Sequence, residues 1–305
     1  MSSDAATSFE KEETKILAVI PSIGGPGLKE VVDLQRTLQG LEHVSCVVVS
    51  NSRRLTQHLE ASKTPFVTDE SNGGFGRSVQ SGARTDENWR WLLIVNDDIN
   101  LDADTFSKAV NANLGANNKH PEIVYFDEDV SRPIPSLRDV FLQVSLLGNI
   151  IRKLRTPHVS EKESYRSFSC VAISKELFDL NDGFDDDLLF TYEDADFVAR
   201  AMKFGARQRV VGKCGVFHSH SLSSGRHIDK VLPVATYSAA RYLDKRGSSL
   251  TVNSLVILLA LLIRLAFVPV TRASKKRHLK GIYFSAKTVI LRAHRRPQLP
   301  DYAKL

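Results

Sequence analysis

Short apolar runs rich in β-branched residues alternate along most of the chain with segments of helical periodicity, and this alternation restricts the possible folds more than any other feature. The runs that predict strands are 16–20, 44–49, 65–67, 91–95, 123–126, 168–173 and 209–217. Residues 29–41 and 192–204 predict helices because their apolar side chains recur every three or four positions, and 175–180 predicts a shorter helix. The alternation predicts an α/β fold in which helices flank a mostly parallel sheet.

Two regions interrupt this pattern and define the predicted domain boundaries. Residues 131–166 contain two prolines before an amphipathic stretch, 137–154, and we interpret the region as an inserted helix and loop. Residues 226–305 follow the last predicted strand and combine an apolar helix with a basic tail. We therefore expect a polar leader over 1–15, an α/β domain over 16–225 that carries the insertion, and a C-terminal helical region.

The positive charge of the chain is concentrated at its C-terminal end. The net charge is +6, but residues 271–305 alone carry +9, from ten Lys and Arg and one Asp, so the first 270 residues carry −3. No nucleic-acid-binding motif accompanies these basic residues, and we do not expect nucleic acid as a partner. A polybasic segment beside an apolar helix favours an anionic membrane surface as the partner.

The apolar segment 250–270 is the candidate for membrane contact. A helix that spans a bilayer needs about 20 apolar residues, and an arginine at its centre costs roughly 2.5 to 3.5 kcal/mol. Because Arg264 interrupts the run, we expect a membrane-associating helix that lies on the bilayer or inserts shallowly, while a full span and a buried core helix stay open. The expected location is the cytoplasmic face of the cell membrane.

The cysteines and the leader agree with that location. Cys46, Cys170 and Cys214 are odd in number, lie far apart within predicted strands and form no C-x-x-C pair, which indicates buried thiols of a reducing compartment. The leader is polar and acidic and lacks the apolar core of a signal peptide, so we expect the α/β domain to stay in the cytosol.

Polar and acidic residues follow the predicted strands at the point where several of them end. Asn96, Asp97 and Asp98 come directly after the run 91–95, and acids also occupy 127–129. Open α/β sheets bind ligands at the carboxyl ends of their strands, so these groups converge on one edge of the sheet. Carboxylate and amide oxygens are hard ligands for Mg2+ or Mn2+ together with substrate phosphates.

Each candidate group also has a structural interpretation. The aspartates after residue 95 fit an ordinary polar turn before a capped helix. The glycine-rich turn 72–76 can bring backbone N–H groups to a phosphate, although it matches neither a P-loop nor a dinucleotide-binding fingerprint. Glu193 and Asp194 either stabilise a helix N-terminus or supply a carboxylate general base. His218 and His220, after the last predicted strand, are metal ligands or structural residues.

Taken together, these features resemble the ordered motifs of family 2 glycosyltransferases, in particular the branch similar to rhamnosyltransferases and galactofuranosyltransferases. The resemblance covers residues 16–224. The motifs that carry it are Asn72-Gly73-Gly74-Phe75-Gly76, Val95-Asn96-Asp97-Asp98, Gly183-Phe184-Asp185, Tyr192-Glu193-Asp194-Ala195-Asp196, Arg200, Gly205, His218 and Ser221. It implies a GT-A fold with a Rossmann-like sheet, a nucleotide-sugar donor, Mg2+ or Mn2+ as cofactor, and inversion at the anomeric carbon.

The resemblance also implies roles for individual residues. Asp98 takes the place of the second acid of the family's D-x-D-type motif and is expected to bind the cation, with His218 completing the metal site. Asp194 takes the place of the general base, and Glu193 belongs to the same acidic pair. The residues expected to contact the nucleotide are Pro21, Ser22, Asn51, Asn72, Gly73, Asn96 and Asp97.

The chain departs from the family's pattern at two places. Ser50 and Asn51 stand where relatives place an aspartate that contacts the nucleobase, and Gln80 stands where they often repeat an asparagine. The resemblance and the basic tail together predict an inverting glycosyltransferase that moves a sugar such as rhamnose or galactofuranose to a lipid-linked or growing cell-envelope glycan. The alternatives are a non-catalytic nucleotide-sugar-binding scaffold protein and a nucleotidyltransferase, although the loop 24–29 lacks the G-x-G-x-R-x-x-P-x-x-x-K pattern of the latter.

Overall fold

The apolar runs of the sequence pair into one central sheet. A computed structural model describes residues 15–24, 27–69, 72–114, 120–127, 130–148, 151, 164–218, 227–271 and 274–291. The sheet has seven strands in the order β10-β6-β9-β4-β1-β2-β3. Their bounds are β1 (Ile16–Ser22), β2 (Val44–Ser50), β3 (Phe66–Thr68), β4 (Trp91–Val95), β6 (Glu122–Tyr125), β9 (Cys170–Ser174) and β10 (Arg207–Val210). Four of its six neighbouring pairs are parallel, and β9 runs against both of its neighbours, which confirms a mostly parallel, Rossmann-like sheet.

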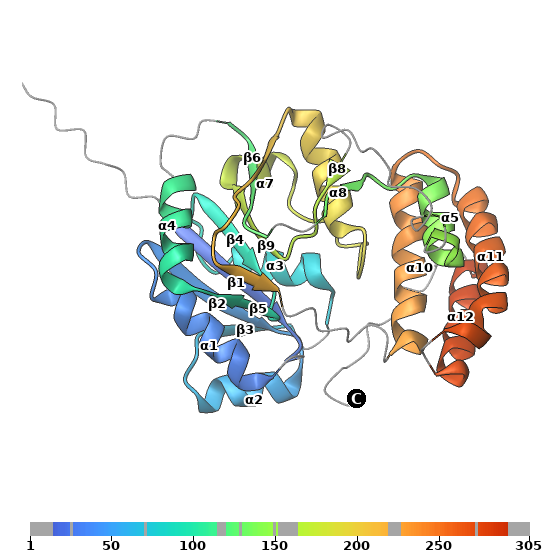
Figure 1. The fold of residues 1–305 in the computed structure, drawn as a ribbon, viewed down its shortest axis with the longest axis horizontal. Helices are drawn as coiled ribbons and strands as arrows, with labels where there is room; N and C mark the ends of the chain where they lie inside the picture. The colour runs from blue at the N-terminus through green and yellow to red at the C-terminus, as the bar shows by residue number, and fades with distance from the viewer. Residues whose placement is uncertain are drawn as a thin grey trace, which may run out of the picture.

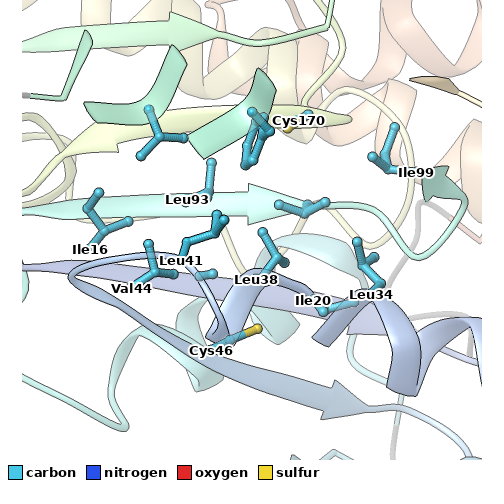
Figure 2. Packing of buried hydrophobic residues seen from close by; sticks show 14 of the residues in the cluster. Ile16, Ile20, Leu34, Leu38, Leu41, Val44, Cys46, Leu93, Ile99 and Cys170 are labelled. Atoms are coloured by element: carbon cyan, nitrogen blue, oxygen red, sulfur yellow. The ribbon is translucent and has the colours of Figure 1, made fainter. Parts of the chain in front are cut away.

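Helices cover both faces of this sheet (Figure 1). One face is covered by α1 (Leu28–Gln39), α2 (Arg53–Ala61) and α4 (Ala103–Asn113), and the other by α3 (Phe75–Ala83), α7 (Lys175–Leu180) and α8 (Glu193–Ala201). Side chains alternate along each strand between the two faces, so Ile16 and Ile20 join one core and Leu17 the other. Figure 2 shows the first core, where Leu34 and Leu38 of α1 lie over the strands.

The predicted strand 209–217 is wrong, because the chain turns within it. β10 ends at Val210, and β11 (Val216–His218) pairs instead with β5 (Ile99–Leu101) in a separate two-stranded sheet. Lys213 and Gly215 have φ angles of 53° and 74°, in the left-handed region that reverses the chain. Cys214 therefore lies in a turn and not in a strand, although all three thiols are free and buried as expected.

The late helix of the α/β unit ends close to the predicted position. The segment 192–204 forms α8 followed by the 3-10 helix η2 (Met202–Phe204). Gly205 ends it with a φ of 71°, which confirms the predicted glycine stop. A helix start is also capped as expected: Asp102, directly before α4, accepts a hydrogen bond from the Thr105 N–H at 2.9 Å.

The insertion contributes a short hairpin and the helix α5. β7 (Arg132–Pro133) pairs with β8 (Ser164–Tyr165), and α5 (Leu137–Ser145) lies between them in sequence. The helix is shorter than the amphipathic stretch 137–154, because Leu146 adopts a left-handed φ of 68° directly after it. Residues 152–163 lie outside the described part of the chain.

The C-terminal helices and α5 form a helical lobe beside the sheet (Figure 1). The lobe consists of α5, α10 (Ile228–Lys245), α11 (Leu250–Phe267) with η3 (Val268–Val270), and α12 (Lys275–Ile290). It has its own apolar core, to which Val144, Leu243, Ile257 and Ile282 belong. The leader up to residue 14 and the tail beyond residue 291 are outside the described residues.

Arg264 faces the interior of this lobe. Its guanidinium donates hydrogen bonds of 2.8 Å to the carbonyl oxygen of Val144, in the last turn of α5, and of 2.8 Å to Nε2 of His278 on α12. The expected energetic cost of placing this arginine in lipid therefore does not apply, because protein groups surround it. By length and composition alone, Leu250–Val270 is the one helix among the described residues that could cross a membrane, and 39% of its apolar window is buried inside the protein.

Candidate active site

Three polar side chains meet where β4, β6 and β11 end. Asp98 lies in the turn between β4 and β5, and the pairing of β11 with β5 sets His218 opposite Ile99. His218 Nε2 consequently lies 3.1 Å from Asp98 Oδ2. On the other side of the ring, His218 Nδ1 lies 3.3 Å from Oδ2 of Asp127, which follows β6. All three side chains are only 14% to 19% exposed.

This cluster suits a divalent cation that a substrate helps to bind. Among the described residues, no group of three or more His, Cys, Asp and Glu is arranged as a complete metal site. Mg2+ is commonly held by one or two carboxylates together with substrate phosphates, and Asp98 supplies one such carboxylate. The imidazole of His218 would add a nitrogen donor beside it. The carboxylate of Asp127 lies beside Nδ1, the side from which carboxylates orient metal-binding histidines.

The predicted nucleotide contacts at the end of β1 are joined to the acidic turn. Ser22 Oγ donates to Asp97 Oδ2 at 2.6 Å and accepts from the Gly24 N–H at 2.9 Å. The Asn96 N–H donates to the Ser169 carbonyl oxygen, which extends the pairing of β4 with β9 by one residue. The edge where β1 and β4 end thus carries Pro21, Ser22 and Asp97 side by side. The Ser22 hydroxyl donates its proton to Asp97 and can act toward a ligand only as an acceptor.

Asn51 is engaged in the interior. Its side chain is buried, and its amide forms two contacts with Ser78 Oγ, at 2.9 Å from Nδ2 and 3.1 Å from Oδ1. Ser78 belongs to α3, so the Asn51 side chain ties the end of β2 to that helix. The expected contact of Asn51 with a nucleotide stays a prediction, and in this arrangement it requires the bonds to Ser78 to be exchanged.

Asp69 organises the glycine-rich turn, a role that the sequence analysis missed. Its Oδ2 accepts from the Gly73 N–H at 3.3 Å and pairs with Arg77 Nε at 3.4 Å. The Asn72 N–H donates to the Asp69 carbonyl oxygen at 2.9 Å, and Asn72 itself has a φ of 44°. The position of Asp69 directly after β3 was the available signal, because acids that follow strands gather at this edge of the sheet.

Glu193 and Asp194 start α8 in different surroundings. Glu193 is buried, and burial, reinforced by the neighbouring charge of Asp194, raises the pKa of its carboxyl to about 8. Asp194 is half-buried, and its Oδ1 accepts from the Ala195 N–H at 2.7 Å. A group that is protonated at neutral pH and buried cannot serve as the base that meets a substrate, so Asp194 is the better candidate of the two.

Asp194 lies near the phenols of Tyr125 and Tyr165. Burial raises the pKa of the Tyr125 phenol above its usual range, and the carboxylate of Asp194 raises it further. Burial also raises the pKa of Tyr165, and the Asp194 carboxylate raises it further. Tyr125 is the last residue of β6, two positions before Asp127. Glu128, Asp129, His220 and Ser221 lie outside the described residues.

Comparison with known proteins gives structural neighbours of low similarity. No protein-family model and no curated protein matches the sequence. Glucosyl-3-phosphoglycerate synthase from Mycobacterium tuberculosis, solved with uridine diphosphate, is 14% identical with a TM-score of 0.49, covering 78% of this chain and 82% of that chain. TarS from S. aureus is 12% identical with a TM-score of 0.42, covering 83% of this chain and 44% of that chain. Similarity at this level does not transfer an activity, so the function proposed below rests on the residues of the site.

Proposed function

We propose that the protein is an inverting glycosyltransferase of the GT-A type, which uses Mg2+ or Mn2+ to move a sugar from a nucleotide-sugar to an acceptor hydroxyl. The observation that carries the proposal is the cluster of Asp98, His218 and Asp127 at the carboxyl ends of the strands. That Asp194 reaches the same site is part of the proposal. A cation site and a general base are the two groups that a single displacement requires.

The donor end of the reaction depends on charge stabilisation. A bound divalent cation supplies positive charge against the negative charge that develops on the departing nucleoside diphosphate. Asp98 and His218 would hold it, and the Asp127 carboxylate, 3.3 Å from His218 Nδ1, would orient the ring. The edge formed by Pro21, Ser22, Asn72 and Gly73 is the proposed nucleotide side of the site.

The acceptor end of the reaction depends on Asp194. Its carboxylate takes the proton of the acceptor hydroxyl as that oxygen bonds to the anomeric carbon. The bond from the anomeric carbon to the diphosphate oxygen breaks on the opposite face of the sugar, and the configuration inverts. One base is sufficient for this single step. Rhamnose and galactofuranose are the donor sugars that the sequence motifs favour, with a lipid-linked or growing cell-envelope glycan as acceptor.

Replacement of Asp98 tests the cation site without requiring the sugar to be known. Asp98→Asn should weaken Mn2+ binding, measured by electron paramagnetic resonance with Mn2+ alone and with Mn2+ plus UDP, by about 10- to 100-fold, because a charged ligand is replaced by a neutral one. Asp102→Asn is the matched control, since Asp102 lies four residues later and only caps α4. Equal Mn2+ affinity in Asp98→Asn and the wild-type protein would contradict the assignment.

We also propose that the helical lobe docks the enzyme on the cytoplasmic face of the membrane. In Figure 1, α11 and α12 lie on the side of α10 that faces away from the sheet. The outer face of α11 presents Leu255, Leu259 and Leu262, which are 62%, 53% and 63% exposed and recur at helical spacing. On α12, Tyr283 is exposed beside lysines such as Lys287. Exposed leucines with adjacent basic residues suit the interface of an anionic bilayer.

Vesicle sedimentation tests this docking surface. The triple variant Leu255→Ser, Leu259→Ser and Leu262→Ser should lower partitioning onto anionic phospholipid vesicles by at least about 100-fold, because each leucine withdrawn from lipid costs roughly 1.5 kcal/mol. The fold should persist, since these side chains already face solvent. Phe204→Ser, which changes an exposed aromatic side chain of η2 on the α/β unit, should bind as the wild type does. Undiminished binding of the triple variant would argue against the proposal.

A further inference from the structure

The backbone just before Asp194 is held in an unfavourable conformation. Thr191 and Tyr192 have φ angles of 67° and 72°, so two consecutive residues with Cβ atoms occupy the left-handed region. Such residues persist only where their surroundings hold them, and they concentrate at functional sites. Glu193 and Asp194 follow directly, and the direction in which α8 starts therefore depends on what holds residues 189–192, here called the presenting segment.

The helical lobe holds the presenting segment from one side through α10. Ser238 Oγ accepts hydrogen bonds from the Leu189 N–H at 3.2 Å and from the Phe190 N–H at 3.3 Å. Four residues later on the same helix face, the ring of Tyr242 stacks on that of Tyr192, with centroids 5.1 Å apart and planes at 26°. Ser238 and Tyr242 are both fully buried, so neither contact is a solvent-exposed one.

Further contacts attach the same region to the lobe. Lys245 of α10 pairs with Asp185 and lies 3.5 Å from Asp187, both just before the presenting segment. The Tyr192 hydroxyl donates to Gln143 Oε1 on α5 at 2.9 Å. On its other side the segment touches the glycine-rich turn, because a Cβ at Gly74 would lie 2.1 Å from the Leu189 carbonyl oxygen. The presenting segment is thus fixed between α10 and the proposed nucleotide side of the site.

We infer that Ser238 and Tyr242 are positioning residues for Asp194, so that the helical lobe is part of the catalytic unit as well as a membrane-docking surface. This inference rests on the proposed function. A general base must lie within hydrogen-bonding distance of the proton it removes, and the start of α8 sets where the Asp194 carboxylate lies. Loss of the two hydrogen bonds to Ser238 would let Thr191 and Tyr192 relax, and Asp194 would move with them.

Ser238→Ala tests the inference through kinetics and amide exchange. A displacement of about 1 Å at a reacting group lowers a rate by roughly 100-fold, so kcat should fall on that scale while the donor KM and Mn2+ affinity stay at wild-type values. The amides of Leu189 and Phe190 should exchange with deuterium faster than in the wild type. Ser285→Ala is the matched control, because Ser285 is equally buried in the lobe and, among the described residues, its hydroxyl bonds only to the Gly281 carbonyl oxygen of its own helix.

A pair of variants at Tyr242 separates positioning from stability. Tyr242→Phe keeps the stacked ring and removes only the hydrogen bond to the Pro135 carbonyl oxygen, so the melting temperature should fall while kcat stays at the wild-type value. Tyr242→Leu removes the stacking and should lower kcat. Wild-type kcat in Tyr242→Leu, or a kcat in Ser238→Ala equal to that in Ser285→Ala, would overturn the inference.

The exchange measurement distinguishes this inference from the proposed function. If the wild-type protein transfers no sugar, the proposed function is refuted, but the contact of Ser238 with the Leu189 and Phe190 amides can still be measured by exchange. In that case unchanged exchange of the Leu189 and Phe190 amides in Ser238→Ala would refute the inference, and faster exchange that spreads into residues 191–195 would support it.

Discussion

Asp194→Asn should lower sugar transfer by about 1000-fold or more while the nucleotide-sugar still binds, because a positioned general base contributes roughly 10²- to 10⁴-fold to the rate. Asparagine keeps the size of the side chain and an oxygen that can accept from the Ala195 N–H, so the start of α8 should not change. The measurement is single-turnover transfer together with donor binding by calorimetry. Transfer at the wild-type rate would remove Asp194 from the mechanism.

Glu193→Gln is the matched control for that variant. The pKa of Glu193 is raised to about 8 by burial and by Asp194, so its carboxyl is protonated at neutral pH and a neutral amide resembles it. Transfer by Glu193→Gln should therefore remain close to the wild-type rate at pH 7. A loss as large as that of Asp194→Asn would show that Glu193, and not its neighbour, carries the proton.

The same carboxyl makes the stability of the wild-type protein depend on pH. Its pKa is higher in the folded chain than in the unfolded chain, where a glutamate titrates near 4.3. The folded state binds the proton more tightly, so the contribution of Glu193 to the free energy of unfolding is lost as pH rises from about 4.3 through about 8. Denaturant unfolding across this window should therefore show that the free energy of unfolding of Glu193→Gln increases relative to that of the wild type as pH rises.

Gly74→Ala should unfold or inactivate the protein, with a loss of more than about 4 kcal/mol in the free energy of unfolding. Gly74 has a φ of 102° and a ψ of 173°, a conformation that is essentially restricted to glycine. A Cβ there would also lie 2.1 Å from the Leu189 carbonyl oxygen and 2.8 Å from its carbonyl carbon, and neither backbone atom can swing away as a side chain can.

Gly205→Ala separates backbone strain from steric exclusion. Gly205 also has a positive φ, of 71°, but apart from its neighbours in the chain no atom of the described residues lies within 4 Å of the position of its Cβ. Its replacement should cost only the left-handed penalty, about 1 to 2 kcal/mol. Chemical denaturation of both variants measures the difference. Similar losses in the two would mean that the contact between Gly74 and the presenting segment is unimportant.

Much of the sheet follows from local sequence signals. The run 91–95 and the helix 175–180 coincide with β4 and α7, because β-branched and apolar clusters there are bounded by clear polar breaks. The convergence of acids at strand ends also followed from the topology of parallel sheets, since the residues near Asp98 and Asp127 do lie at one edge.

Long-range pairing explains what the sequence analysis missed. Val211 and Cys214 continue the apolar run and make 209–217 resemble one strand, but the chain turns at Lys213 and Gly215, and β11 pairs with the distant β5. That same pairing brings His218 to Asp98, 120 residues away, and no local pattern records it. The inward orientation of Arg264 likewise depends on contacts that the local sequence does not show. Val144 of α5 is 120 residues away, and His278 lies on α12, after the end of α11.

The most direct test of the central claim is a screen of nucleotide-sugars for release of the nucleoside diphosphate by the full-length protein, with and without Mn2+ or Mg2+. We predict release from one class of nucleotide-sugar when an acceptor glycan is supplied, dependence on the cation, and loss of release in Asp98→Asn. A protein that binds a nucleotide-sugar but releases no diphosphate from any donor under these conditions would contradict the account and indicate a non-catalytic binding protein.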